Sequence, residues 1–487
     1  MMSFLYKVAY GPVADLSKKD QLEWASNQVQ DFLDYGKSEG NENHSLDAPS
    51  WPDFLKFDLA SRIEQSQYFK QIRVSKKALQ KNMLYGSAST SVYHEPDNKI
   101  GFKIWECDQL RLAHQGAYTL NPVLQRLMLF WWNHFTVGGK SQTSKYYTGH
   151  LYFDVVAQGM NGFFNDLLFK VTKHPAMLSY LDNVLNVGEN SLYALRKSHK
   201  KNIGMNDNLA RELLELHTIS NRMPYSETDI RETAKILSGW GFRFNRKPGK
   251  IKALFQDLSN YDTPYVSQRA EPGKKIVLGH SFSAGPSGLR ELADFLANQD
   301  ATIHHIATSL CQHFVSDSPS HEDVAHVIKA WQKTNGFLPS VHIAVLERAF
   351  KNSEKKIQWP LIWFFSILRS SGVEFLPKWH EQWSFDRSKL GVGSMNEIYS
   401  ELGQNFWSKR QPDGFSLYGK DWISSEFLDR RLKISAILGV IFSQSGKIDD
   451  LIKKFEFDSA TKALVSQAEN SHESFVLWAN SPEMMGL

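Results

Sequence analysis

The sequence predicts a mainly α protein, with a large multi-helix globular body and a small irregular or β-hairpin insertion near residues 247–286. Hydrophobic residues make up 42% of the 487 positions, enough to bury one large core or two cores that share an interface. Apolar residues recur at three-and-four spacing through 322–333 and 341–350, which is typical of amphipathic surface helices. Glycine, proline and serine gather in the insertion, where Lys275-Ile276-Val277-Leu278 favours a strand.

The insertion is also the natural boundary between two parts of the chain. We expect residues 1–246 to form an N-terminal helical half, 247–286 an insertion or lid, and 287–487 a C-terminal helical half. The apolar runs 359–368 and 434–442 are about half as long as the ~20 residues that a bilayer span needs. They predict buried core helices and no membrane span.

Composition excludes several classes of protein. The formal charge of +4 is a mild excess over a long chain, which argues against a nucleic-acid partner. Cys107 and Cys311 are the only cysteines, so there is no disulfide framework and no C-x-x-C motif. The first residues show no secretory leader, which favours a soluble, cytoplasmic protein. We identify neither a phosphate-cradling glycine loop nor a nucleophile elbow in the sequence. No motif of these kinds therefore points to a particular cofactor or to an acyl-transfer reaction.

One apolar segment of the chain carries a charged residue that we expect to be buried. Residues 123–135 are apolar nearly all the way round, which predicts a buried helix. Burying Arg126 without a partner is costly, so we expect it to meet a carboxylate. The candidate partners are Glu212, Glu215 and Asp182.

Farther along the chain, Ser226 and Asp229 have the spacing of a capping box, which predicts a helix that runs to Ser238. Gly239, just after it, is suited to end this helix.

The segment 206–218 predicts a helix with one polar stripe. On a wheel of roughly 100° per residue, Asn208, Arg211, Glu212 and Glu215 fall within an arc of about 100°. Leucines occupy the other side, together with His217, which we therefore expect to be at least partly buried. Arg211 and Glu215 are four apart and can pair, keeping Glu215 ionised and leaving the pKa of Glu212 freer to shift. If Arg126 meets these carboxylates, the stripe faces the buried helix inside the protein.

Several segments together resemble one bacterial family, domain of unknown function 1800, over nearly the whole chain. The similar stretches, in order, are 130–136, 174–183, 206–218, 225–240, 301–317 and 402–430. The most specific is Asn206-Asp207-Asn208-Leu209-Ala210-Arg211-Glu212-Leu213-Leu214-Glu215-Leu216-His217-Thr218. The resemblance implies no particular reaction. It implies an exported location for many members and a sulfatase-like companion protein. This chain departs from the family pattern in having Asp207 where members commonly have Glu, and Ala270 where they often have His.

The leading hypothesis is an enzyme with an acid–base centre. The abundant aromatic residues favour a hydrolase that acts on a polysaccharide or cell-envelope substrate. The predicted catalytic residues are Glu212, Glu215, His134 and Arg211. The predicted substrate-binding residues are Asn133, Asp182, Asn208 and Arg126. Two alternatives stay open: a non-catalytic binding or scaffold protein with a buried ion network built from Arg126, Arg211, Glu212, Glu215 and Asp182, and a metal-binding protein that uses His134, Glu212 and Glu215. His304, His305 and His313 lack the spacing of an H-E-x-x-H helix, so we predict no metal ligands there.

Overall fold

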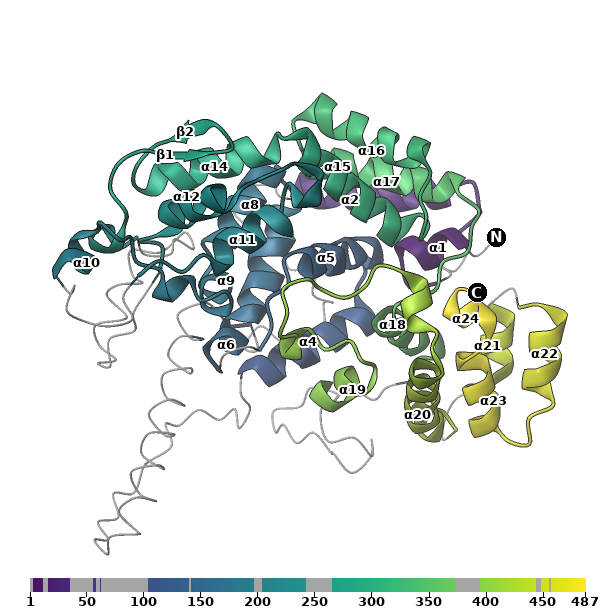
Figure 1. Ribbon diagram of the computed structural model, residues 1–487. Helices are drawn as coiled ribbons and strands as arrows, with labels where there is room; N and C mark the ends of the chain where they lie inside the picture. The colour runs from purple at the N-terminus through teal and green to yellow at the C-terminus, as the bar shows by residue number, and fades with distance from the viewer. Residues whose placement is uncertain are drawn as a thin grey trace, which may run out of the picture.

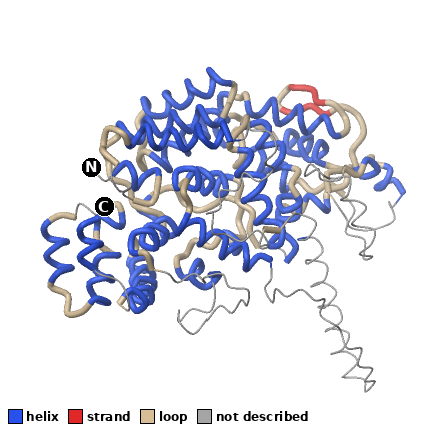
Figure 2. The backbone as a smooth tube through the Cα atoms, turned by 180° about the vertical axis from the view of Figure 1, so that it is seen from behind, coloured by secondary structure: helices blue, strands red, loops and turns tan. Residues whose placement is uncertain are grey.

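The computed structural model describes residues 3–11, 16–35, 56–57, 62, 104–139, 142–196, 204–241, 265–373, 395–443, 448–454 and 457–487. Helices account for almost all regular structure in this part of the chain, and they gather around the central α5 (Pro122–His134) (Figure 1). The hairpin of β1 (Lys275–Val277) and β2 (His280–Phe282) lies at the periphery (Figure 2). The mainly α prediction is confirmed. The predicted insertion is described only from residue 265 onward.

The remaining elements before the hairpin are α1 (Ser3–Val8), α2 (Gln21–Tyr35), α4 (Ile104–Tyr118), α6 (Gln142–His150), the π-helical η2 (Leu151–Val156), α7 (Ala157–Gly159), α8 (Phe164–Thr172), α9 (Pro175–Tyr180), η3 (Asn183–Leu185), α10 (Leu192–Arg196), α11 (Asn208–Glu215), η4 (Ser220–Arg222), α12 (Glu227–Leu237) and η5 (Ser267–Arg269). Those after it are α14 (Pro286–Ala297), α15 (Asp300–Phe314), α16 (His321–Thr334), α17 (Leu338–Lys351), α18 (Pro360–Ser371), α19 (Met395–Glu401), η7 (Phe406–Ser408), η8 (Gly419–Trp422), α20 (Ser425–Phe442), α21 (Ile448–Lys454), α22 (Ser459–Ser466), α23 (Ser471–Ala479) and α24 (Pro482–Met485).

Helix α5 is buried from Pro122 to Asn133, as its apolar sequence predicts. Pro122 opens the helix, where its missing N–H costs no hydrogen bond. Trp131 and Trp132 are fully buried, and the Trp132 ring packs on Tyr152, Phe406 and Trp407. The C-terminal residues of α5 therefore face segments that lie far away in the sequence.

Helix α11 is shorter than the predicted helix of residues 206–218. It begins at Asn208 and ends at Glu215. The Thr218 hydroxyl donates to the carbonyl oxygen of Leu213 at 2.7 Å, and the backbone N–H of His217 still reaches Glu212. These bonds satisfy carbonyls of the last turn while the chain turns away. The leucine side is buried as predicted, and the polar side is half-exposed.

Helix α12 has the predicted capping box. The Ser226 hydroxyl accepts from the N–H of Asp229 at 3.2 Å, and the Asp229 carboxylate accepts from the N–H of Ser226 at 2.8 Å. Gly239, just beyond the helix, has φ +92°, a conformation that favours glycine. The second oxygen of Asp229 accepts from the N–H of Leu278 at 2.6 Å, so the helix cap also anchors the hairpin turn.

The predicted core helices of the C-terminal part form with one difference. The run 359–368 becomes α18, which is buried from Pro360 to Leu368. The run 434–442 lies in α20, where Ile434, Leu438 and Phe442 are buried but Val440 is 52% exposed. This second run therefore buries only one side, because α23 packs on α20 from one direction. In the described part of the chain, no helix has the length and apolar character needed to cross a membrane.

Gln358 joins three distant parts of the fold just before α18. Its side-chain amide donates to the carbonyl oxygen of Tyr6 at 2.7 Å, and its N–H donates to that of Met485 at 2.9 Å. Its own carbonyl accepts from Arg431 of α20 at 2.7 Å. Helices α1, α20 and α24 thus meet at one buried residue.

Candidate functional site

The polar stripe of α11 lies at the surface. The Arg211 side chain is 34% exposed and donates to Glu227 at 2.9 and 3.1 Å and to Glu215 at 3.4 Å. The predicted Arg211–Glu215 pair is therefore confirmed. The main partner is nevertheless Glu227, on α12, which the wheel of a single helix does not include. Arg211 therefore joins α11 to α12. An ion pair with an exposed carboxylate contributes only modestly to the free energy of unfolding.

Arg126 does not meet a carboxylate, so that prediction is wrong. Its guanidinium donates to the carbonyl oxygens of Tyr6 at 3.1 Å, Lys7 at 2.7 Å and Ala9 at 2.7 Å. The last carbonyls of a helix lack intrahelical partners, so the C-terminal end of α1 supplies the acceptors that a buried cation needs. Burial lowers the pKa of Arg126 to about 10, which leaves the side chain charged at neutral pH.

The location of Arg126 also removes the buried ion network predicted for the scaffold alternative. Arg126 lies against α1, whereas Arg211 lies at the surface between α11 and α12. The two arginines therefore share no carboxylate, and the stripe does not face Arg126.

Asn133, at the last turn of α5, binds the segment that follows η7. Its side-chain amide donates to the carbonyl oxygen of Phe415 at 2.9 Å and accepts from the N–H of Phe415 at 2.7 Å. Gly414 has φ +71°, and a Cβ there would lie 2.6 Å from the Asn133 carbonyl oxygen. Only glycine permits this close approach. The C-terminal end of α5 is therefore clamped to the segment 409–418.

Three histidines surround the turn after α11. The Nε2 atom of His134 lies 3.2 Å from the carbonyl oxygen of His217. The Nε2 atom of His305 lies 3.2 Å from the carbonyl oxygen of Leu216. A carbonyl only accepts, so each Nε2 carries the proton and donates. His217 is 1% exposed, and neither of its ring nitrogens has a hydrogen-bond partner among the described residues. His217 is buried as predicted, and its burial lowers its pKa to about 3.

This arrangement gives His134 a positioning role. Its protonated nitrogen holds the backbone beyond α11, and burial, with His217 and His305 nearby, lowers its pKa well below the usual range. Among the residues that the structure describes, no group of three or more histidine, cysteine, aspartate or glutamate side chains is placed to hold a metal ion. The geometry thus offers no support for the metal alternative.

Glu212 lies on the side of α11 that faces α9 and the segment 409–418. Burial, together with the charges of Asp413 and Glu212, raises the pKa of the Tyr180 hydroxyl. That hydroxyl donates to the carbonyl oxygen of Lys409 at 3.3 Å, and the Lys409 ammonium pairs with Asp413 at 3.0 Å. Glu212 therefore acts electrostatically on residues that connect to the clamp formed by Asn133.

The other two predicted binding residues lie at backbone turns. Asp182 has φ 59° and precedes η3. The N–H of Asn208 donates to Asn206 at 3.2 Å, and the N–H of Asn206 donates to Asn186 at 3.1 Å. Ala270 lies beside Gly239 and precedes Glu271. These residues surround loop junctions and line none of the clefts described below.

Two adjoining clefts open beside the clamped segment. The first, the Trp422 cleft, has a volume of about 410 Å³ and is lined by Gln312, Lys409, Asp413, Gly414, Phe415, Ser416, Leu417, Tyr418, Asp421, Trp422 and Phe427. The second, the His304 cleft, has about 370 Å³ and is lined by Arg222, His304, Thr308, Gln312, Asp317, Ser318, Pro319, Ser320, His321, Val324 and Tyr418. Gln312 and Tyr418 line both, so the two clefts adjoin at these side chains, and together they are called the groove below.

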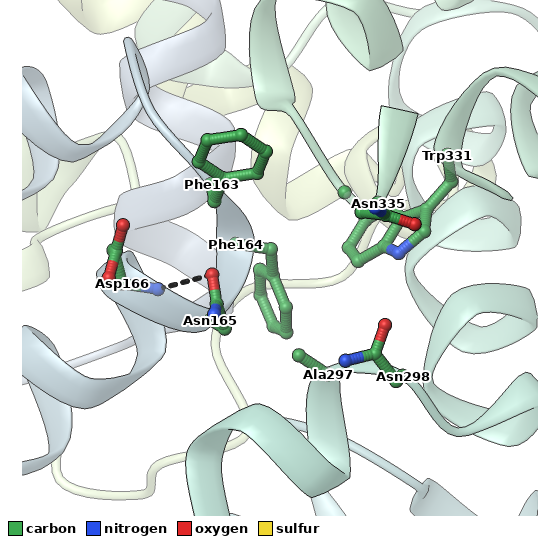
Figure 3. A pocket seen from close by; sticks show the side chains of 9 residues that line it. Phe163, Phe164, Asn165, Asp166, Ala297, Asn298, Trp331 and Asn335 are labelled. Carbon is green, nitrogen blue, oxygen red and sulfur yellow. Dashed lines mark hydrogen bonds between the residues drawn. The ribbon is translucent and has the colours of Figure 1, made fainter. Parts of the chain in front are cut away.

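A third cleft, of about 460 Å³, lies apart from the predicted residues, between the start of α8 and the ends of α14 and α16 (Figure 3). Two of its polar side chains, Asn165 and Asn298, already make hydrogen bonds within the protein. Asn165 accepts from the N–H of Asp166 and donates to Asp294, and Asn298 donates to the carbonyl oxygen of Asp294. Phe164 and Trp331 are fully buried, which leaves their faces covered.

The groove is the part of the site that the sequence reasoning missed. Its aromatic residues come from one short segment, Phe415 to Phe427, which follows Gly414 and contains Gly419. Aromatic residues in a glycine-containing stretch between helices were the available signal. The other wall comes from η4, α15 and the start of α16, and only folding brings it alongside.

Comparison with known proteins gives a family and no activity. A family model described as protein of unknown function (DUF1800) matches residues 4–485, nearly the entire chain. Neither the curated proteins nor the solved structures include a match. The resemblance found in the motifs of α5, α11 and the C-terminal segment is thereby confirmed. The chain belongs to the family described as protein of unknown function (DUF1800).

Proposed function

We propose that the protein binds a polysaccharide chain in the groove formed by the Trp422 cleft and the His304 cleft. The observation that carries the proposal is a shared aromatic residue: Tyr418 lines both clefts and is 40% exposed. A ligand built of repeating units can occupy adjoining hollows, whereas a compact ligand is held in one enclosed pocket.

The Tyr418 ring is held in place, which suits a stacking platform. Its hydroxyl accepts from the side-chain amide of Gln312 at 3.0 Å, and the Lys420 ammonium lies 5.4 Å from the ring centre. A fixed aromatic face binds the apolar C–H face of a sugar ring at little entropic cost, because the side chain is already ordered.

The polar lining of the groove supplies both hydrogen-bond donors and acceptors. Lys409 donates, whereas Asp413 and Asp421 accept, and all three line the Trp422 cleft. Sugar hydroxyls act in both roles, so a mixed lining matches them better than a lining of one charge. The clamp between Asn133 and Phe415 fixes the floor of this cleft, which links the family motif at the end of α5 to the proposed binding surface.

The test replaces Tyr418 and a matched surface tyrosine. Tyr418→Ala removes the shared platform, and we expect about tenfold weaker binding, the loss typical of one stacking contact of roughly 1–2 kcal/mol. Tyr118→Ala is the control, because Tyr118 is 38% exposed on α4, outside the groove. Retardation in native gels cast with dextran, xylan or polygalacturonate measures the binding. Absence of retardation for the wild-type protein in every gel, or equal retardation of both variants, would overturn the proposal.

Hydrolysis of the bound chain stays a finer prediction. This hypothesis makes Glu212 the acid or base, but Glu212 is not among the residues that line the groove, and its charge acts on Tyr180, whose hydroxyl reaches Lys409. Release of reducing sugar from the bound polymer is the expected sign of such activity. A Glu212→Gln variant that released sugar as fast as the wild-type protein would contradict the assignment.

A further inference from the structure

We propose that the His304 cleft is a subsite for an anionic substituent, a carboxylate or a sulfate, on the polysaccharide. This inference rests on the proposed function, because it names the chemical class of the chain that occupies the groove. Its basis is a set of basic side chains that line one end of the groove: Arg222 from η4, His304 from α15 and His321 from the start of α16.

These basic groups lie close enough to repel one another. Partial burial, followed by the charges of Arg222 and His321, lowers the pKa of His304 below its usual value. Within the described residues, Arg222 forms no ion pair, and its hydrogen bond is to the Thr308 hydroxyl at 3.4 Å. An anion in the cleft would replace this mutual repulsion with attraction.

The carboxylate that lines the same cleft is already neutralised. Asp317 binds the Lys356 ammonium, and its other oxygen accepts from the N–H of Gly419 at 2.7 Å. The start of α16 is likewise closed by its own capping box of Ser320 and Asp323. The positive charge left facing the cleft therefore belongs to Arg222 and, once it is protonated, to His304.

The hydrogen bonds of His304 determine when it can hold an anion. The Thr308 hydroxyl has one proton, which it donates to the carbonyl oxygen of His304 at 2.7 Å. It must then accept from His304 Nδ1, which lies at 3.1 Å. The neutral imidazole consequently carries its proton on Nδ1, and Nε2 donates only after protonation. The charged and titratable groups that line the cleft with His304 are Arg222, His321 and Asp317, and Asp317 is paired with Lys356.

The subsite and the groove make different demands on the ligand. A neutral chain needs only the Tyr418 platform and the hydroxyl contacts, whereas an acidic chain gains a contact with Arg222. The protein should therefore bind acidic polysaccharides more tightly than neutral ones, and the difference should increase from pH 7.5 to pH 5.5 as His304 becomes protonated.

The binding experiment compares Arg222→Gln with Arg231→Gln. Arg231, on α12, is an exposed arginine that pairs with Glu189 and is absent from the groove lining. With polygalacturonate or dextran sulfate we expect Arg222→Gln to bind about fivefold more weakly than the wild-type protein, the effect of one partly exposed charge contact. With dextran the two variants should bind equally. The carboxylate and sulfate polymers then distinguish the two sources of charge.

Each outcome separates the subsite from the groove. Equal loss of dextran and polygalacturonate binding in Arg222→Gln would overturn the anionic subsite while leaving the groove intact. Binding of a single-stranded oligonucleotide more tightly than any polysaccharide would assign the basic cleft to a different polymer and overturn the inference. An independent measurement follows the imidazole of His304 by NMR: monomeric galacturonate should raise its pKa, and an unchanged titration would also overturn the subsite.

Discussion

Asn133 shows how one side chain connects the buried core to the proposed groove. A carboxamide offers one donor and one acceptor side by side, so it can pair with a backbone amide as a neighbouring strand would. Asn133 makes this pair with Phe415, and Gly414 leaves the space for it. The residue is therefore better described as a positioning residue than as the substrate ligand that its motif suggested.

Replacement of Asn133 by alanine tests this role. The change leaves the N–H and carbonyl of Phe415 without partners in a largely buried place, so we expect the free energy of unfolding to fall by about 2 kcal/mol. Asn298→Ala, on an exposed side chain, should change it by less than about 0.5 kcal/mol. Urea denaturation measures both. Equal stability of the two variants would show that the clamp is not needed.

The interaction partner of a side chain could be predicted from the sequence only where the two residues are close neighbours on one helix. The Arg211–Glu215 pair follows from a spacing of four on one helix, and the structure has it. The partners of Arg126 are carbonyls 117 to 120 positions away, at the end of α1. Backbone carbonyls carry no signature in the sequence, so a carboxylate was the only visible candidate.

At the scale of elements, α12 and the hairpin are stabilised as a unit through Asp229. One carboxylate oxygen closes the capping box with Ser226, and the other holds the turn at Leu278. That turn contains two consecutive positive φ angles, 50° at Leu278 and 74° at Gly279. A leucine in this conformation is strained, so the bond from Asp229 compensates for a local cost.

Two substitutions distinguish the functions of Asp229. Ser226→Ala removes only the N-cap and should lower the free energy of unfolding by about 1 kcal/mol. Asp229→Ala also releases the Leu278 N–H, and we expect a loss larger by about 1 kcal/mol. Amide hydrogen exchange should then accelerate in β1 and β2 for Asp229→Ala only. The same exchange pattern in both variants would mean that the cap does not hold the hairpin.

The bounds of a helix could be predicted where residues next to its ends have a recognisable capping pattern. The capping box and Gly239 gave both ends of α12. The end of α11 was misplaced because Thr218, at an apparently ordinary helical position, turns its hydroxyl back to Leu213. Hydroxyl side chains compete with the helix for its own carbonyls, and spacing alone does not show which competitor wins.

The whole molecule contains neutral histidines that resist protonation. Burial lowers the pKa values of His217 and His342 to about 3, and the Trp131 indole donates to His342 Nε2 at 2.9 Å. In the unfolded chain a histidine titrates near pH 6.5. Between these values the unfolded chain binds more protons, so the folded state loses stability as the pH falls from about 6.5 towards 3.

This difference predicts a steep dependence of stability on acid. Each buried histidine contributes about 1.4 kcal/mol per pH unit below 6.5, and the contribution vanishes above that pH. Urea denaturation at pH 7.5, 6.0 and 5.0 measures the slope. His217→Gln should reduce the slope by roughly one histidine, whereas His280→Gln, on the exposed strand β2, is the control. A slope unaffected by His217→Gln would contradict this account.

The groove belongs to the whole molecule and explains why the site was only partly predictable. Its walls come from residue 222, from 304–324 and from 409–427. Helix periodicity identified α11 as a marked segment, but no local pattern relates Arg222 to Tyr418. Such a relation depends on packing between elements, which a single sequence does not display.

The junction at Gln358 has a consequence for biosynthesis. Tyr6 and Met485 meet through this residue, so α1 cannot complete these contacts until α24 has been synthesised. The Tyr6 hydroxyl also donates to the sulfur of Met484, which lies 478 positions further along the chain. Contacts of such long sequence separation form late because the loop between them must close first, so we expect the docking of α1 against α24 to be a late step of folding.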